Sequence, residues 1–139
     1  KYVYADLATR RPKPMPEDFK ALFTKKMELE KVVPLEDPPS HAQVVQCHTS
    51  YSNLDMQYHV NQSQYMKFAM NAGCSVSEKG GFSVLKVKKV KCLFLGENMT
   101  DEVINVHVWE DDKNPFMLYF YMEKEGKCVY QTVFEYYSD

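Results

Sequence analysis

Residues Leu54–Phe68, with the sequence LDMQYHVNQSQYMKF, join a polar loop to an apolar helix. From Asn61 to Gly73 the apolar side chains fall on one helical face, which consists of Tyr65, Phe68, Ala69 and Ala72, with Met66 and Met70 alongside. A face this wide predicts a helix that is buried on most sides. Asn61 or His59 stands where the cap of the first turn belongs, and Gly73 stands where a helix commonly ends.

Strand patterns lie on both sides of this helix. Ala42–Thr49 precedes it, and four more strands are predicted after it, at Phe82–Leu95, Val103–Trp109, Phe116–Met122 and Lys127–Tyr137. In the first of these four the apolar residues change parity at Lys88 and Lys89, which predicts a β-bulge. Phe116–Met122 is apolar throughout and is expected at the centre of a sheet, with both faces covered. The order of elements predicts an α+β fold in which an antiparallel sheet packs on one helix.

The composition of the chain changes near residue 42. Six of the seven prolines lie before it, and most β-branched and aromatic residues lie after it. Residues 9–16, TRRPKPMP, cannot form a regular helix and are expected to be extended. Pro16 suits the first turn of a helix over residues 16–30, whose apolar stripe is Phe19, Leu22, Phe23 and Met27. We therefore expect an N-terminal linker segment with a short helix at 1–41, and one folded domain at 42–139.

Composition also excludes several classes of protein. Seventeen lysines and arginines against nineteen acids leave a net charge of −2, which is no electrostatic footprint for nucleic acid. No apolar run reaches the roughly 18 residues that a transmembrane helix needs.

The four cysteines form no CxxC pair, so free thiols in an intracellular, reducing compartment are expected. The chain starts at Lys1 and not at a methionine, which leaves cytoplasm or organelle open. No paired His or Cys has metal-ligand spacing, so no metal or other cofactor is expected.

The loop before the central helix has the groups for carbonyl chemistry. Asp55 can act as a general base for water or as a nucleophile, and His59 can orient a substrate or move a proton. The first turn of the following helix offers free N–H groups and a positive dipole end, which can hold a polarised carbonyl oxygen. The alternative is a polar loop with a helix cap and no chemistry.

The same stretch resembles the signature of hotdog-fold acyl thioesterases, which has the form D-x-x-x-H-V-N-N-x-x-Y. Asp55, His59, Val60, Asn61 and Tyr65 match it. Plant acyl-ACP thioesterases and the 4-hydroxybenzoyl-CoA thioesterase group carry such patterns. The resemblance implies a hotdog fold over residues 42–137, in which a curved antiparallel sheet wraps around a central helix. The first forty residues resemble the segment that joins two hotdog units in tandem acyl-ACP thioesterases. They imply the second half of a double-hotdog protein, or a descendant that kept only that half.

The resemblance also implies a function. It implies hydrolysis of an acyl thioester carried on coenzyme A (CoA) or acyl carrier protein (ACP), with Asp55 activating water or attacking the carbonyl and His59 assisting. N–H groups near Asn61 and Gln62, together with Gln57, would form the oxyanion and substrate site. Tyr65 would pack the helix on the sheet. The expected partner is a second copy in a homodimer, or another hotdog unit.

Three positions depart from the family pattern and support a different function. Asn53 stands where a second acid is frequent, Gln57 stands where the plant enzymes have Asn, and Gln62 replaces the second Asn of the motif. The plant enzymes also use an acid–cysteine pair on the following strand, and Cys92 is out of register with it. These departures favour a non-catalytic hotdog module that binds acyl groups or serves in assembly. A hotdog hydratase is a third alternative, but the Asp-His arrangement of that group is not found here.

Overall fold

The computed structural model describes residues 6, 8–9, 11–21, 32–76 and 87–137. Contacts divide the chain into two compact units, Lys1–Lys31 and Val32–Asp139. The first unit contains the short helix α1, Glu17–Ala21, with acidic residues in its first turn. The remainder of the helix predicted over residues 16–30 lies outside the described residues. No described helix is long and apolar enough to cross a membrane.

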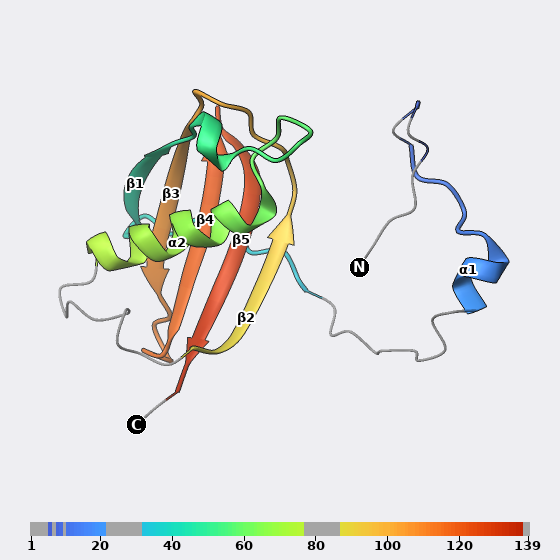
Figure 1. The fold of residues 1–139 in the computed structure, drawn as a ribbon. Coiled ribbons are helices and arrows are strands. Elements are labelled where there is room, and N and C mark those ends of the chain that lie inside the picture. The colour runs from blue at the N-terminus through green and yellow to red at the C-terminus, as the bar shows by residue number, and fades with distance from the viewer. Residues whose placement is uncertain (1–5, 7, 10, 22–31, 77–86, 138–139) are drawn as a thin grey trace. The chain divides into compact units, whose positions relative to one another are not determined.

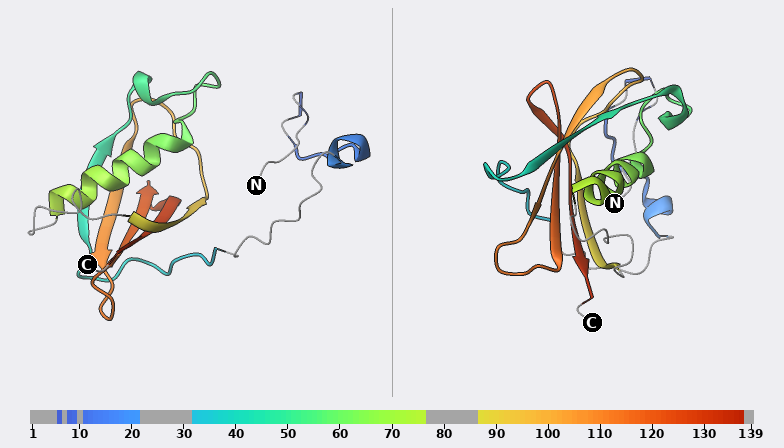
Figure 2. Two further views of the ribbon diagram at one scale, coloured as in Figure 1. Left: turned by 60° about the horizontal axis from the view of Figure 1, so that its bottom comes forward. Right: turned by 90° about the vertical axis from the view of Figure 1, so that its left-hand side faces the viewer.

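The second unit is a five-stranded antiparallel sheet with one long helix across its concave face (Figures 1 and 2). The helix is α2, Gln62–Val76, and the short 3₁₀ helix η1, Tyr51–Asn53, precedes it. The strands are β1 Gln43–His48, β2 Val87–Phe94, β3 Val103–Glu110, β4 Met117–Lys124 and β5 Lys127–Tyr136. Their spatial order is β1-β3-β4-β5-β2. The predicted α+β layout is therefore confirmed.

The core lies between α2 and the inner face of the sheet. Alternate residues of the central strands are buried there, namely Ile104, Val106 and Val108 of β3 and Leu118, Phe120 and Met122 of β4. From α2 the buried side chains are Tyr65, Phe68, Ala69 and Ala72. Met70, which was expected alongside this face of a helix buried on most sides, is half exposed, because the helix buries one stripe rather than most of its circumference. The outer face of β4 is only partly covered, so the expectation of two covered faces holds for the inner face alone.

Gly73 does not end the helix, contrary to the sequence prediction. The helix runs through it to Val76, and Gly73 is buried. A Cβ atom at this position would lie 3.2 Å from Phe120 Cζ and 3.3 Å from Leu118 Cδ2. The glycine therefore lets the helix approach the sheet closely, a reason that helical periodicity alone cannot reveal.

The predicted bulge in β2 is confirmed. Val87 pairs with Tyr136 and Lys89 with Glu135, so the register shifts at Lys88. Lys88 Nζ lies 2.5 Å from Glu135 Oε1 across the strands. The extra residue brings the later apolar side chains of β2 to the side of the sheet that carries the core.

The strand order determines where the β2–β3 connection runs. β2 lies at one edge of the sheet, while β3 lies between β1 and β4. Residues 95–102 must therefore cross the end of the sheet, and they pass beside the start of α2 (Figure 1). Val60 N–H donates a 2.8 Å hydrogen bond to the Asn98 carbonyl, which ties this connection to the polar loop before α2.

Candidate active site

Asp55 and His59 are the paired residues that close a tight hairpin loop. The N–H of Asp55 donates to the His59 carbonyl at 2.8 Å, and the N–H of Tyr58 donates to the Asp55 carbonyl at 3.0 Å. Leu54 and Val60 form a bridge just outside this pair. Tyr58 has a φ of 62°, in the left-handed region that a three-residue hairpin loop requires at its last position. The spacing between the acid and the histidine is thus set by backbone hydrogen bonds.

The Asp55 carboxylate has one oxygen engaged in the loop. Its Oδ1 accepts the N–H of Gln57 at 2.8 Å and that of His59 at 3.4 Å. No group among the described residues bonds its Oδ2. Asp55 therefore stabilises the turn with one oxygen and presents the other to solvent.

A cavity of about 360 Å³ opens beside this loop. It is lined by Asp55, Gln57, His59, Val60, Gln62, Tyr65, Phe94, Leu95, Gly96 and Glu97. Four of the five site residues predicted from sequence thus share one cavity, while Asn61 is not in its wall. Its size falls within the usual range for small-molecule sites.

One backbone N–H at the start of α2, beside this cavity, has no partner among the described residues. Asn61 is the cap, because its Oδ1 accepts the N–H of Ser63 at 3.0 Å. The N–H of Asn61 itself donates to the Asn53 carbonyl at 2.9 Å, and the N–H of Gln57 donates to Asp55. The N–H of Gln62 has no partner among the residues that the structure describes. Of the backbone N–H groups at the predicted oxyanion site, only that of Gln62 is therefore left without a partner among the described residues.

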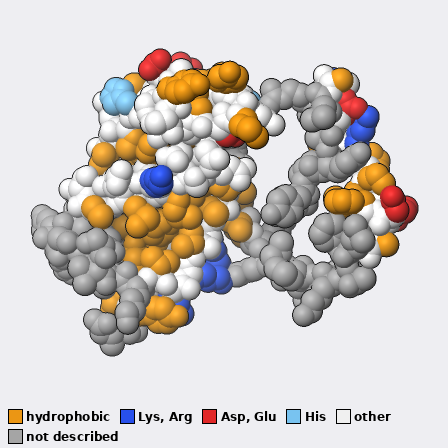
Figure 3. Space-filling model, in the orientation of Figure 1, with side chains coloured by type: hydrophobic (Ala, Val, Ile, Leu, Met, Phe, Trp, Pro, Cys, Tyr) orange, Lys and Arg blue, Asp and Glu red, His pale blue; other side chains and the backbone are white. Residues whose placement is uncertain are grey.

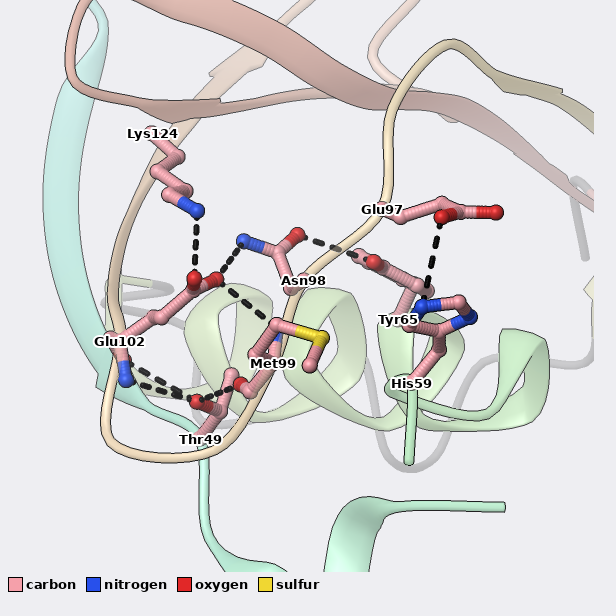
Figure 4. Close-up of polar contacts among 8 residues, drawn as sticks. All are labelled: Thr49, His59, Tyr65, Glu97, Asn98, Met99, Glu102 and Lys124. Carbon is pink, nitrogen blue, oxygen red and sulfur yellow. Dashed lines mark hydrogen bonds and ion pairs between the residues drawn. The ribbon is translucent and has the colours of Figure 1, made fainter. Parts of the chain in front are cut away.

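Glu97 is a further acid in this cavity, and sequence reasoning missed it. Its Oε2 lies 3.5 Å from Nε2 of His59, and the two form an ion pair when the imidazole is protonated. Figure 4 shows the two side chains pointing toward one another. The His59 side chain is 17% exposed and that of Glu97 is 69% exposed. The residue after Glu97 is Asn98, so no acid–cysteine pair faces His59 from this loop. No local pattern singles out Glu97, since only the strand order brings it to His59.

Aromatic side chains form the inner wall of the cavity. Tyr65 and Phe94 line it, and both pack on Tyr130, with ring centroids 5.1 Å and 4.8 Å from that of Tyr130. Burial raises the pKa of Tyr65 to about 12, so its phenol stays protonated near neutrality. Its hydroxyl donates to Asn98 Oδ1 at 2.9 Å. Tyr65 thus packs α2 on the sheet, as expected, and offers no base to the cavity.

Glu102 anchors the connection that carries Glu97. Its Oε2 accepts Asn98 Nδ2 and the N–H of Met99, both at 2.9 Å, and its Oε1 pairs with Lys124. Burial acts to raise the pKa of Glu102, but the hydrogen bonds from Lys124, Met99 and Asn98 outweigh it and leave the pKa below its ordinary value. The ionised form is therefore favoured by folding.

Glu102→Gln is expected to destabilise the protein near neutral pH and much less in acid. Because the folded-state pKa is lowered, the stabilisation is present above the unfolded-state pKa and is lost as pH falls through the folded-state value. Urea unfolding of both proteins at pH 7 and pH 3 measures this difference. Glu125→Gln, at an exposed turn, is the matched control. A difference between Glu102→Gln and the parent that is the same at both pH values would contradict the expectation.

The described residues contain no cluster of three or more His, Cys, Asp or Glu side chains that could hold a metal ion. The four cysteines are free thiols. The arrangement at the cavity is instead a carboxylate, an imidazole backed by a second carboxylate, and a helix-start amide. Such a set can activate water, transfer a proton and stabilise an oxyanion without a metal.

Comparison with known proteins rests on solved structures, since the sequence matches no family model and no curated protein. The 12:0-ACP thioesterase from Umbellularia californica matches 97% of the chain with a TM-score of 0.71 and 16% identity. An acyl-ACP thioesterase from Bacteroides thetaiotaomicron matches 96% with a TM-score of 0.72 and 13% identity. The chain spans about half the length of these two proteins, 53% of each. A probable thioesterase from Bartonella henselae matches 68% of the chain over 87% of its own, with a TM-score of 0.61 and 13% identity.

These likenesses establish the fold. At 13–16% identity, the arrangement of strands and helix is what the chain shares with the three thioesterases. The chain has the hotdog fold, in which a curved antiparallel sheet wraps around a central helix. The fold that the motif at residues 54–68 implied is therefore confirmed.

Proposed function

We propose that this chain hydrolyses an acyl thioester carried on CoA or on ACP. The observation that carries the proposal is that Asp55, His59, Gln62 and Glu97 all line one cavity. The structural likeness to thioesterases supports the same reaction class, and the match to two acyl-ACP thioesterases along most of the chain favours a fatty acyl substrate.

In this proposal Asp55 starts the reaction through its free oxygen. It either removes a proton from a water molecule that attacks the thioester carbonyl, or attacks that carbonyl itself to give an anhydride that water then cleaves. The N–H of Gln62, at the positive end of α2, donates to the developing oxyanion. The C–S bond then breaks, and protonated His59, whose charge Glu97 stabilises, gives a proton that converts the thiolate to a free thiol. The proton released from water then returns His59 to its protonated form.

The polar mouth and aromatic wall of the cavity suit the two parts of such a substrate. Asp55, His59 and Glu97 lie where the thioester would react, while Tyr65 and Phe94 offer apolar surface to the acyl group. The polar residues thus match the thioester group, and the aromatic residues match the acyl chain. A panel of thioester substrates measures the preferred acyl chain length and the choice between CoA and ACP.

A second hotdog unit is part of the proposal. The strand β2 has one neighbour in the described sheet, β5, so its outer edge is open. Hotdog units pair through such edges, and we propose either a homodimer or pairing with another hotdog unit. Residues 1–41 would then act as the linker segment before the hotdog domain at 42–139.

The alternative is a hotdog module that binds acyl groups without turnover. One observation favours it, because Asp55 already has a structural role in its loop through Oδ1. The substitutions Asn53, Gln57 and Gln62 in the motif point the same way. A binding module would keep the cavity and its aromatic wall but would not need the free carboxylate oxygen.

Thiol release from a panel of acyl-CoA and acyl-ACP thioesters tests the proposal. We expect turnover that depends on acyl length, measured with a thiol reagent that reacts with free CoA or ACP. Thermal stabilisation of the protein by the same thioesters without any thiol release would reject hydrolysis and support the binding module. Hydration of an enoyl-CoA, measured in a separate assay as loss of its double bond, would support the hydratase alternative instead.

A further inference from the structure

The residue that follows Glu97 is fixed in the core of the domain. Asn98 is fully buried, with 0% exposure. Its Oδ1 accepts the hydroxyl of Tyr65 and its Nδ2 donates to Glu102, both at 2.9 Å (Figure 4). Both ends of the Asn98 amide are therefore satisfied, so the side chain cannot rotate without breaking both hydrogen bonds.

Glu102 in turn is fixed from three directions. It accepts hydrogen bonds from Asn98 and Met99, and pairs with Lys124 of β4. Its main chain is bound to the buried Thr49, whose Oγ1 accepts the Glu102 N–H at 2.9 Å and whose N–H donates to the Glu102 carbonyl at 2.9 Å. The connection 95–102 thus ends in a rigid anchor that joins β4 to the end of β1.

One backbone hydrogen bond links this anchor to the histidine. The carbonyl of Asn98 accepts the N–H of Val60 at 2.8 Å. Val60 follows His59 directly, and Asn98 follows Glu97 directly, so the bond joins the two segments that carry the acid and the imidazole. Glu97 itself is mostly exposed and its contact with His59 is 3.5 Å, too long to set the spacing alone.

We infer that Asn98 and Glu102 are positioning residues, which hold the Glu97 carboxylate opposite His59 through the Asn98–Val60 hydrogen bond. Lys124 supports the same positioning, because it neutralises the charge of Glu102 beneath the loop. The catalytic part of this inference rests on the proposed thioesterase activity. The geometric part, that Glu102 fixes the Val60 amide and the His59–Glu97 contact, does not depend on it.

A double-mutant cycle tests the catalytic part. Glu102→Gln keeps an oxygen acceptor for Asn98 or Met99 but places an NH₂ group or a neutral oxygen beside Lys124. We expect about a tenfold lower kcat with KM changed less than about twofold, since small misplacements of a catalytic group act mainly on the chemical step. In a Glu97→Gln background the same change should cost less than about twofold, because the group being positioned is already gone.

The readouts separate positioning from general damage to the fold. Equal losses of kcat in both backgrounds would overturn the inference, and so would an unchanged kcat in Glu102→Gln. Glu125→Gln is the matched control and should leave kcat at the parent value. If Glu102→Gln does not fold, Lys124→Met takes its place in the cycle with the same expectations, because it removes the ion pair that holds Oε1 of Glu102 and so loosens the anchor of Asn98.

Nuclear magnetic resonance tests the geometric part without any turnover. In Glu102→Gln the Val60 amide should exchange with solvent at least about tenfold faster, because its hydrogen bond to Asn98 opens more often. At one fixed pH, the His59 ring signals should also move in the direction seen for Glu97→Gln. Unchanged exchange at Val60, or His59 signals that stay at the parent position, would overturn the inference. A parent that releases no thiol would reject the proposed function, while these two signals would still decide the role of Glu102.

Discussion

Asp55→Asn is expected to lower the rate of thiol release at least about 100-fold, the usual range for loss of a general base or nucleophile. Asparagine keeps an oxygen that can accept the N–H of Gln57, so the loop that Oδ1 stabilises should persist. What disappears is the negative charge on the oxygen that no described residue bonds. The comparison therefore separates the chemical role of Asp55 from its structural role.

The measurement is kcat on the best thioester of the panel, together with the melting temperature of each variant. Asp112→Asn makes the same change at an exposed aspartate outside the cavity and should leave both values unchanged. Parent-like turnover in Asp55→Asn would leave an esterase but remove Asp55 from its mechanism. A drop in turnover matched by a large drop in melting temperature would point to the loop rather than to the chemistry.

Much of the fold could be predicted because its determinants are local. Alternation of apolar residues identified the strands, and the change of parity at Lys88 and Lys89 located the bulge that β2 contains. Asn61 was predicted as one of two possible caps, and its side chain does accept the N–H of Ser63. Each of these features depends on residues within a few positions of one another, which is the range over which a sequence pattern carries information.

The features that were missed depend on contacts distant in sequence. Glu97 meets His59 only because β2 pairs with β5 and its connection to β3 must cross the sheet end. Asn98 is buried for the same reason. Gly73 has the sequence appearance of a helix end, yet the ring of Phe120 explains it. The use of the Asn61 N–H by Asn53 likewise requires the folded loop, and it leaves Gln62 as the free amide.

Phe120→Ala is expected to lower the free energy of unfolding by about 3–5 kcal/mol, the range for truncating a buried phenylalanine. Phe120 lies on the central strand β4 with 0% exposure, and its ring packs against Phe134 with centroids 5.2 Å apart. The edge of the same ring lies 3.2 Å from the position that a Cβ on Gly73 would take, and Gly73 has no side chain that could move into the space after truncation. The cavity should therefore collapse poorly, which places the cost towards the upper end.

Urea unfolding measures this cost, with Val44→Ala as the control. Val44 lies on the edge strand β1 and is 53% exposed, so its truncation should change the free energy of unfolding by about 0.5 kcal/mol or less. A loss for Phe120→Ala no larger than that of the control would mean that α2 does not pack on β4 as the structure has it. This result also bears on the candidate active site, because α2 begins at the cavity with Gln62 and packs on the sheet through Gly73 and Phe120. A helix that shifts on β4 carries with it the N–H of Gln62, the proposed oxyanion donor, so turnover should fall even at temperatures where Phe120→Ala remains folded.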